Sequence, residues 1–545
     1  MKRRSFLKKS LGAVSVPFLI NGMPVRTLAN QLAGMVSRND HDKVVVMIQL
    51  AGGNDGLNTL IPVHQYDLYK ASRQNMAIPN SGNRKYILLD EQMPEPELLG
   101  LHPDLTELKS MYDEKLVTIV QNVGYENTNL SHFRGRDIWF MGGGATDYYH
   151  SGWMGRYLDG SFDGYPDDYP NEDMPDPLGL EFGYAMSLAF HRNEGIPAGL
   201  AITDPDTFYE LVTGTGTEPP DWLPDSYRGD ELQYLMDLEL KSNQYAERIK
   251  NVYDNGINSP NVLYPETYPG IAPEQYKQNP LSWQFKILAR LLSGGIKSKM
   301  FVLKIDGFDT HADQVIPGDP TYGIHGALLY HLNKAVKAFY DDLKEQGLDQ
   351  NVLTFTTSEF GRRVHSNASW GTDHGMAAPV FLFGPMLKSG VVGSPTDLTD
   401  LDDGNLKYEF DYRRLYTSIL KDWMETPDEI IDQVYWSEFI NNRLDIFKGP
   451  DGIHENGGFA ASTDMLIYPN PATEMAFIKT NLTKKGHLEL SVFDLQGRKI
   501  VSVFEGYKSI GEHLFNLNIA HLPSGYYMVR MRSGFKTESR KLIVQ

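Results

Sequence analysis

A short apolar run that ends in a glycine-rich turn constrains this chain more than any other feature. Residues 44–60 read VVVMIQLAGGNDGLNTL, with five apolar residues in a row from Val44 to Ile48. Such a run, bounded by turn residues, is typical of a strand buried on both faces in a parallel sheet. Ligands of open α/β sheets lie beyond the carboxyl ends of strands. The pattern therefore makes Asp55 a candidate ligand, although a plain Asn-Asp-Gly turn explains it equally well.

Further apolar runs alternate with amphipathic segments up to about residue 450. Strands alternating with helices predict an α/β fold, with a parallel sheet covered by helices on both faces. The remaining strands are expected at Leu116–Val123, Met300–Ile305, Val352–Thr357 and Val380–Phe383, and the helices at Leu105–Tyr112, Pro280–Leu292 and His325–Gln346.

The composition and the pattern of apolar residues change after about Pro450, which suggests a second domain. Residues 451–463 are glycine-rich and are expected to form a linker. From residue 464 to 545, short alternating segments are separated by turns, a pattern typical of a small β-sandwich. Its strands are expected at Leu488–Phe493, Lys499–Phe504, Glu512–Leu517, Tyr526–Met531 and Arg540–Val544.

Residues 1–30 have the pattern of an export signal. A basic start, Lys2-Arg3-Arg4, precedes the apolar segment Leu11–Ile20. The run from Arg3 to Lys8 resembles the twin-arginine signal, and a general secretory signal is the alternative. The apolar segment is too short to span a membrane. We therefore expect an exported protein that is not integral to the membrane and that passes through the periplasm to the cell surface or beyond.

Net charge and cysteine content limit the kinds of partner and of metal ligand that this chain can use. The net charge is −19, although the first 30 residues carry six basic side chains and no acidic one. So acidic a body argues against nucleic acid as a partner and favours cations, including bound metal. The chain has no cysteine, which excludes disulfides and thiolate ligands. Any metal is therefore held by oxygen or imidazole ligands, which suit Zn²⁺, Mn²⁺, Mg²⁺ or Ca²⁺.

Acidic, histidine and serine residues gather in a few short segments, several of which follow predicted strands. Because parallel strands end at one edge of a sheet, three of the acidic clusters are expected on one rim. Metal ions there would polarise an ester oxygen and lower the pKa of a hydroxyl or water. The candidate ligands are Asp55, Asp309, His311, Glu359, Asp373 and His374, the candidate nucleophile is Ser131, and the candidate anion-binding residues are Arg134 and Arg136.

Each of these residues also has a structural interpretation. Ser131 could cap a helix that starts near His132. His311 and His374 could be hydrogen-bonded structural histidines, and Asp309 or Asp373 could be turn residues. Glu359 is harder to explain this way, because an unpaired carboxylate after a buried strand is costly.

Several of these segments together resemble a known family. AGGNDGLNT, NLSHFRGRDIW, GWMGRYLD, DGFDTH, SEFGRR and GTDHG occur in this order. They resemble the exported bacterial family called domain of unknown function 1501, over roughly residues 40–450. That family is similar to the alkaline-phosphatase and sulfatase superfamily, which uses a parallel sheet, a Ser- or Thr-type nucleophile and one or two metals.

The resemblance implies roles for individual residues. Asp55 resembles the metal-binding acid after the first core strand, and Ser131 falls where the nucleophile of the superfamily would be expected. Asp309 and His311 resemble the Asp-and-His pair of one metal site, with a tighter spacing than the usual Asp-x-x-x-His. Glu359, Asp373 and His374 resemble the later metal ligands.

The C-terminal segment resembles the type A sorting domain of the type IX secretion system. YPNP at 468–471, FDLQGR at 493–498, LPSGYY at 522–527 and KLIV at 541–544 carry this resemblance. It implies contact with the secretion machinery.

Together these features predict an exported metal-dependent hydrolase of phosphate or sulfate esters, acting on an anionic small molecule or glycan. The alternative is a non-catalytic cell-surface binding protein on the same fold.

Overall fold

The computed structural model describes residues 19–20, 23–24, 43–214 and 245–448, and most of 465–544. In the last range, residues 469, 471, 474, 483–485, 494–497, 510, 521 and 534–535 are not described. The expected linker at 451–463 and most of the expected export signal therefore lie outside the described residues. The chain divides into two compact units, residues 1–451 and 452–545.

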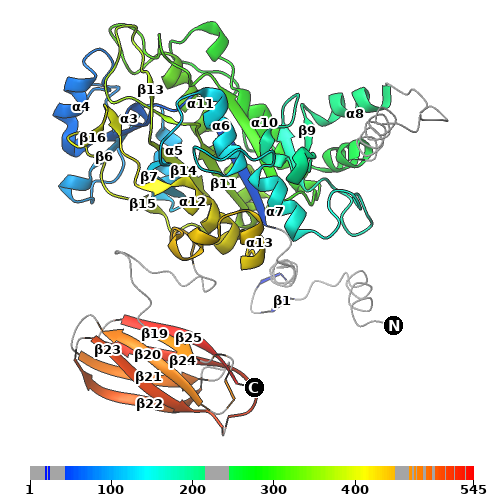
Figure 1. Cartoon of the computed structure of the whole chain (residues 1–545), viewed down its shortest axis with the longest axis vertical. Coiled ribbons are helices and arrows are strands. Elements are labelled where there is room, and N and C mark those ends of the chain that lie inside the picture. The colour runs from blue at the N-terminus through cyan, green and yellow to red at the C-terminus, as the bar shows by residue number, and fades with distance from the viewer. Residues whose placement is uncertain are drawn as a thin grey trace. The chain divides into compact units, whose positions relative to one another are not determined.

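A nine-stranded sheet forms the centre of the first unit (Figure 1). Its order is β15-β7-β14-β11-β3-β10-β8-β9, and β18 also pairs with β7. The strands are β3 (Val44–Ala51), β7 (Val117–Gly124), β8 (Gly179–Phe182), β9 (Leu200–Ile202), β10 (Met300–Asp306), β11 (Val352–Thr357), β14 (Ala378–Phe383), β15 (Gly390–Val392) and β18 (Phe410–Asp411). The predicted α/β fold is confirmed, and its sheet is mostly parallel.

One strand runs against the others. The strand β14 is antiparallel to both β11 and β7, whereas every other pair in this sheet is parallel. A parallel return usually needs a crossover helix. Here the chain between β11 and β14 instead forms the short hairpin of β12 (Gly361–Arg362) and β13 (His374–Gly375). The sequence predicted a parallel sheet, and β14 is the strand that departs from this prediction.

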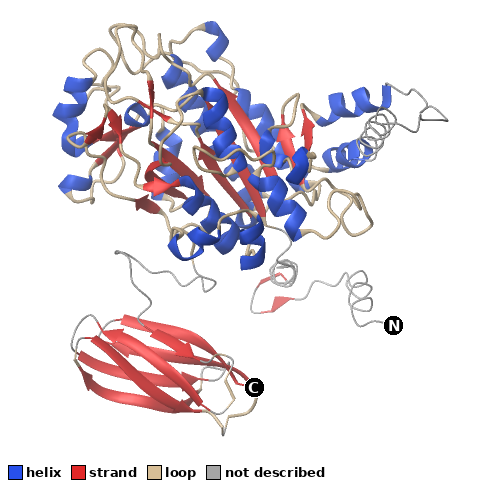
Figure 2. Cartoon of the chain, in the orientation of Figure 1, coloured by secondary structure: helices blue, strands red, loops and turns tan. Residues whose placement is uncertain are grey.

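Helices cover both faces of the sheet (Figure 2). The alternation along β3 explains this arrangement, since Val44, Val46 and Ile48 belong to one apolar cluster while Val45 and Met47 belong to another. The first cluster includes α5 (Thr106–Asp113), α10 (Pro280–Ser293) and α11 (Ile324–Glu345); the second includes α6 (His132–Met141), α7 (Trp153–Ser161), α12 (Tyr412–Ser418) and α13 (Asp428–Gln433).

Smaller elements complete the first unit. They are α3 (Gly56–Thr59), α4 (Tyr66–Ser72), α8 (Pro205–Gly214), the sheet of β4 (Leu60–Pro62), β5 (Ile87–Leu88) and β6 (Leu99–Leu101), and the pairs β1 (Leu19–Ile20) with β2 (Met23–Pro24) and β16 (Leu401–Asp402) with β17 (Asn405–Leu406). None of the described helices is long and apolar enough to cross a membrane.

Strand direction brings distant loops to one edge of the central sheet. The strands β3, β7, β10 and β11 run in the same direction, so the loops that follow them leave from the same edge. Because β14 runs the opposite way, the loop that precedes it also lies there. This rim therefore collects segments that the sequence separates by more than 300 residues.

The second unit consists of two antiparallel sheets around one apolar core. One sheet is β19-β20-β23 and the other is β22-β21-β24-β25. The strands are β19 (Met465–Tyr468), β20 (Met475–Leu482), β21 (Gly486–Phe493), β22 (Lys499–Lys508), β23 (Gly511–Asn518), β24 (Gly525–Ser533) and β25 (Lys536–Val544).

Candidate metal centre

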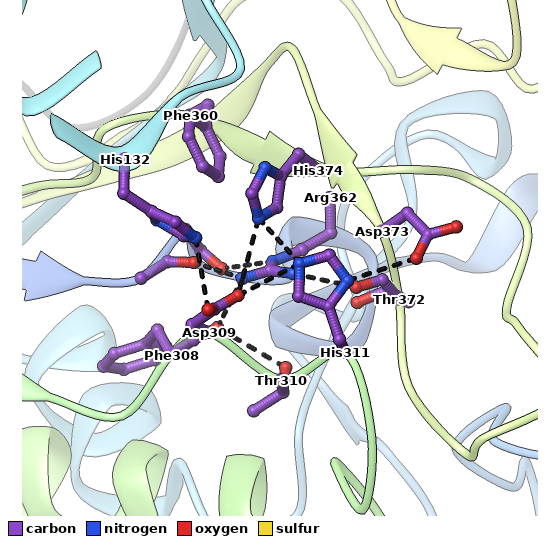
Figure 3. A network of polar contacts seen from close by, with 12 residues as sticks. His132, Phe308, Asp309, Thr310, His311, Phe360, Arg362, Thr372, Asp373 and His374 are labelled. Atoms are coloured by element: carbon purple, nitrogen blue, oxygen red, sulfur yellow. Dashed lines mark hydrogen bonds and ion pairs between the residues drawn. The ribbon is translucent and has the colours of Figure 1, made fainter. Parts of the chain in front are cut away.

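Four ligand-type side chains from three rim segments converge on one point (Figure 3). One ligand atom from each of His132, Asp309, His311 and His374 lies within 4.8 Å of the others. Oδ2 of Asp309 is 3.2 Å from Nε2 of His132. Its Oδ1 is 3.2 Å from Nε2 of His311 and 3.5 Å from Nε2 of His374. The Nε2 atoms of these two rings are 2.7 Å apart.

Nδ1, the second nitrogen of each ring, faces an oxygen atom that accepts hydrogen bonds and cannot donate one. Two of these oxygens belong to ionised carboxylates and the third to a backbone carbonyl. The three pairs are His132 with Glu359 (3.1 Å), His311 with Asp373 (3.2 Å) and His374 with the carbonyl oxygen of Leu130 (2.7 Å). In all three rings, Nδ1 is thus assigned as the donor, and a neutral ring leaves Nε2 as a bare lone pair.

The centre therefore gathers three imidazole lone pairs around one carboxylate. Lone pairs that meet at such distances repel unless a proton or a cation lies between them. The Nε2 atom of His132 is buried and makes no hydrogen bond. Rings held by carboxylates and carbonyls on the far side are the usual arrangement of histidine metal ligands. The donor set therefore fits a divalent metal ion.

Close contacts between backbones build this centre. Gly52, at the end of β3, has a φ of +121°, and a Cβ on it would lie 2.1 Å from the backbone nitrogen of Asp309. Gly371 approaches the backbone of His311 in the same way, since a Cβ at this position would lie 2.4 Å from the carbonyl carbon of His311. Only glycine allows such approaches. The glycines bring the ligand loops into contact.

Arg362 connects these loops from within the protein. Its side chain is fully buried. It donates to Asp309 Oδ1 (2.9 Å) and to the carbonyl oxygens of Gly52, Gly53, Phe308 and Thr372. Burial lowers the pKa of Arg362, which Asp309 partly offsets. The guanidinium therefore holds the Asp309 carboxylate through Oδ1, the oxygen that also faces His311 and His374.

The electrostatics of the site follow from these neighbours. Burial raises the pKa of Asp309, but Arg362 outweighs this effect and holds the pKa below its usual value. The hydrogen bond to Glu359 raises the pKa of His132 despite its partial burial. Burial lowers the pKa of His374, which favours the neutral ring. Asp309 and His311 are about half exposed, so that the centre is open to solvent on one side.

The structure brings three of the six sequence-predicted ligands together and separates the others. Asp309, His311 and His374 belong to the cluster. Glu359 and Asp373 lie behind histidines, as the contacts above indicate. Oε1 of Glu359 also accepts from the backbone N–H of Gly52 (2.7 Å), while its Oε2 is buried without a hydrogen-bond partner.

Asp55 lies apart from the cluster. Its carboxylate accepts from Arg73 (2.5 Å), and both side chains are fully buried. Burial would raise the pKa of Asp55, but the charge and hydrogen bond of Arg73 hold it below the usual value. Gln314 also donates to this carboxylate (2.5 Å).

The three residues predicted to act in catalysis lie on or beside α6. Ser131 is the exposed N-cap residue of this helix, and its side chain makes no capping hydrogen bond. Arg134 donates to the carbonyl oxygens of Ala145 and Asp147. Arg136 is partly exposed and donates to Asp137 (3.3 Å). Ser131 thus neighbours the cluster residue His132 in sequence, whereas the guanidinium of Arg134 is hydrogen-bonded to the loop that contains Ala145 and Asp147.

Sequence reasoning missed His132 and Arg362 as members of the site. His132 follows β7, which ends at the same rim as β3, β10 and β11. Within residues 129–134, the sequence analysis predicted a function for Ser131 and Arg134 but none for His132. The signal available in the sequence was the position of His132 shortly after a predicted strand.

Comparison with known proteins supports both parts of the predicted relationship. Residues 273–429 match the family model Protein of unknown function (DUF1501), and residues 466–545 match the model Secretion system C-terminal sorting domain. These matches confirm the resemblance to this family and to the sorting domain that the sequence motifs indicated. No curated protein matches the chain.

Several solved structures are similar at low identity. The latent PorU from Porphyromonas gingivalis is 19% identical over 18% of this chain and 10% of that chain, with a TM-score of 0.14. The PsFucS1 sulfatase from Pseudoalteromonas sp. is 12% identical over 91% of this chain and 87% of its own (TM-score 0.30). The alkaline phosphatase from the Antarctic bacterium TAB5 is 10% identical over 72% of this chain and 98% of its own (TM-score 0.28).

Proposed function

We propose that this chain, whose residues 273–429 match the DUF1501 family and whose residues 466–545 match a secretion sorting domain, is an exported metal-dependent hydrolase of phosphate or sulfate esters. His132, Asp309, His311 and His374 would hold the ion. The observation that carries this proposal is the convergence of three Nε2 atoms on the Asp309 carboxylate, with Nδ1 of every ring facing an acceptor.

The donor set narrows the choice of metal. Three imidazole nitrogens and one carboxylate suit Zn²⁺ or Mn²⁺ better than Ca²⁺ or Mg²⁺, which prefer oxygen ligands. Among the residues that the structure describes, this is the single group of ligand-type side chains with such spacing. We therefore expect one ion for each chain.

The ion would polarise an ester oxygen and lower the pKa of a nearby hydroxyl or water. Other residues of the chain orient the ligands and place the attacking group. Glu359 and Asp373 orient two of the histidine rings, and Arg362 holds Asp309 in place. Ser131 stands beside His132 at the start of α6, where the positive end of the helix dipole favours an anionic group. We assign the attack to Ser131 or to water, and anion binding to Arg136.

The sorting domain supports export to the cell surface or the extracellular space through contact with the secretion machinery. We extend this proposal to passage through the periplasm, directed by a twin-arginine-like leader within residues 1–30. The acidic body agrees with a protein that recruits cations rather than nucleic acid.

Hydrolysis of aryl phosphate and aryl sulfate esters by the purified chain tests this proposal. The protein is stripped with a chelator and reloaded with Zn²⁺ or Mn²⁺ before each assay. We expect activity that returns with the metal and falls at least about a hundredfold in Asp309→Asn, because removing a charged ligand weakens both binding and charge stabilisation.

His365→Ala is the matched control, since His365 is exposed in the loop between β12 and β13 and lies outside the ligand cluster. A reloaded protein that binds metal yet hydrolyses neither ester class would contradict the hydrolase. It would favour the alternative of a non-catalytic cell-surface binding protein.

A further inference from the structure

A buried glutamine joins the two loops that carry ligands. Oε1 of Gln314 accepts from the hydroxyls of Thr310 (2.9 Å) and Thr372 (2.7 Å). Thr310 stands between Asp309 and His311, and Thr372 is two residues before His374. All three members of this bridge are buried. The glutamine therefore bonds to both ligand-bearing segments at once.

Asp55 determines which way this glutamine points. Nε2 of Gln314 donates to Asp55 Oδ2, and an ionised carboxylate can only accept. The amide oxygen must then face the two threonines. Were the amide reversed, its oxygen would meet the carboxylate and its nitrogen the threonine hydroxyls. The charge on Asp55 thus selects the orientation in which both threonines can donate.

Arg73 keeps Asp55 charged and in place. Its NH1 donates to Asp55 (2.5 Å) and to Asn58 Oδ1 (2.9 Å), while Nε donates to the carbonyl oxygen of Val364 (2.9 Å). The pair is fully buried, so the guanidinium already supplies the positive charge that a metal would bring to this carboxylate.

We infer that Asp55 is a positioning residue of the metal centre rather than a ligand: through Gln314 it fixes the spacing of the loops that carry Asp309, His311 and His374. This inference rests on the proposed metal site and deepens it. The acid at the end of β3 acts from behind the centre, and the centre holds one ion without it.

Metal affinity, stoichiometry and the visible spectrum of the Co²⁺-loaded full chain test this inference. The variants are Asp55→Asn, Gln314→Met, their combination, and Thr372→Val as a milder break of the same bridge. Asp176→Asn is the matched control, because Asp176 is equally buried and paired with an arginine, Arg248, but has no bond to a ligand loop. Thermal unfolding verifies that each variant is folded.

We expect Asp55→Asn and Gln314→Met each to weaken Co²⁺ affinity about tenfold to a hundredfold, the range found for groups behind metal ligands. At saturating Co²⁺, each variant still binds one equivalent. The combined variant is no weaker than either single variant, because both changes break one bridge. Thr372→Val weakens binding less, and Asp176→Asn leaves it unchanged.

Three outcomes would overturn the inference. Wild-type affinity in both single variants would mean that the bridge does not act on the centre. Additive losses would mean that the two residues act independently. A fall from two equivalents to one in Asp55→Asn would make Asp55 a ligand. If the wild-type chain binds no Co²⁺, the proposed function fails, and the inference fails with it; the other outcomes leave the proposed function standing.

Discussion

Nε2 of His311 and Nε2 of His374 lie 2.7 Å apart, while Nδ1 of each ring faces a separate acceptor. Neither Nε2 has a proton to share when both rings are neutral. A cation between them removes this conflict, and Asp309 stands in position to share in binding it. The metal centre is thus indicated by how the rings are held as well as by which residues are present.

Removing one ring should release the ion. We expect His132→Ala or His374→Ala to lower Zn²⁺ affinity at least about a hundredfold, since each takes away one of four ligands. Competition with a colorimetric chelator measures the change. His365→Ala should bind Zn²⁺ as the wild type does, and equal losses in this control would mean that the effect is not specific to the cluster.

Glu359 should matter through His132. Glu359→Gln keeps the shape but replaces a charged acceptor with a neutral amide, so His132 is held less firmly. We expect metal affinity to fall about tenfold to a hundredfold. Glu345→Gln offers a comparison with an acid that contacts Ser259 and Asn261 instead. Unchanged affinity in Glu359→Gln would argue against an orienting role.

Gly52 should tolerate no side chain. In Gly52→Ala, the added methyl group would overlap the backbone of Asp309, and φ is positive. We expect a loss of about 2–5 kcal/mol in the free energy of unfolding together with weaker metal binding. Gly82→Ala separates the two causes, because Gly82 also has a positive φ but open space around it. This control should lose only about 1–2 kcal/mol and keep its metal affinity.

Glu181 in β8 should make stability depend on pH. Burial raises its pKa from 4.5 to about 7, despite the hydrogen bond that the backbone N–H of Ser187 donates to it. When folding raises the pKa of a carboxyl group, the folded state is favoured at pH values below the unfolded pKa, where the group is protonated in both states. This advantage is lost as the pH rises through the folded pKa, because the buried group must then carry a charge. Glu181→Gln removes the cost of the buried charge and should gain about 3 kcal/mol at pH 8.

Denaturant unfolding at pH 8 and pH 5 measures this effect. At pH 5 the gain should shrink to about 1 kcal/mol or less, because the folded protein already holds the proton. Glu95→Gln, on the exposed surface, should change stability at neither pH. A gain of equal size at both values would show that charge on Glu181 is not its cause.

Much of the fold could be predicted because its core strands are unbroken apolar runs. The expected bounds of β11 are the observed ones, and those of α10 differ by one residue. The strands β8 and β9 were missed because they span only four and three residues. The direction of β14 was missed because composition carries no information about whether a connection crosses over or turns back.

The candidate site was predictable in its chemistry more than in its geometry. Asp309 and His311 are expected at the rim because they follow a strand, whereas His374 reaches it only because β14 runs antiparallel to its neighbours, which the sequence did not predict. The sequence does not predict the partner of Asp55 either, since an acid after a strand looks the same whether a metal or Arg73 lies beside it. Nor does the sequence distinguish a ligand from the carboxylate behind it: Glu359, expected as a ligand, lies behind His132, for which the sequence analysis predicted no role.

Metal analysis of the purified chain decides whether these four residues bind an ion. We expect one equivalent of Zn²⁺ or Mn²⁺ after reloading, which is lost in Asp309→Ala and retained in His365→Ala. A chain that binds no divalent ion at the reloading step, or an Asp309→Ala variant that keeps the full equivalent, would contradict a metal centre at these four residues.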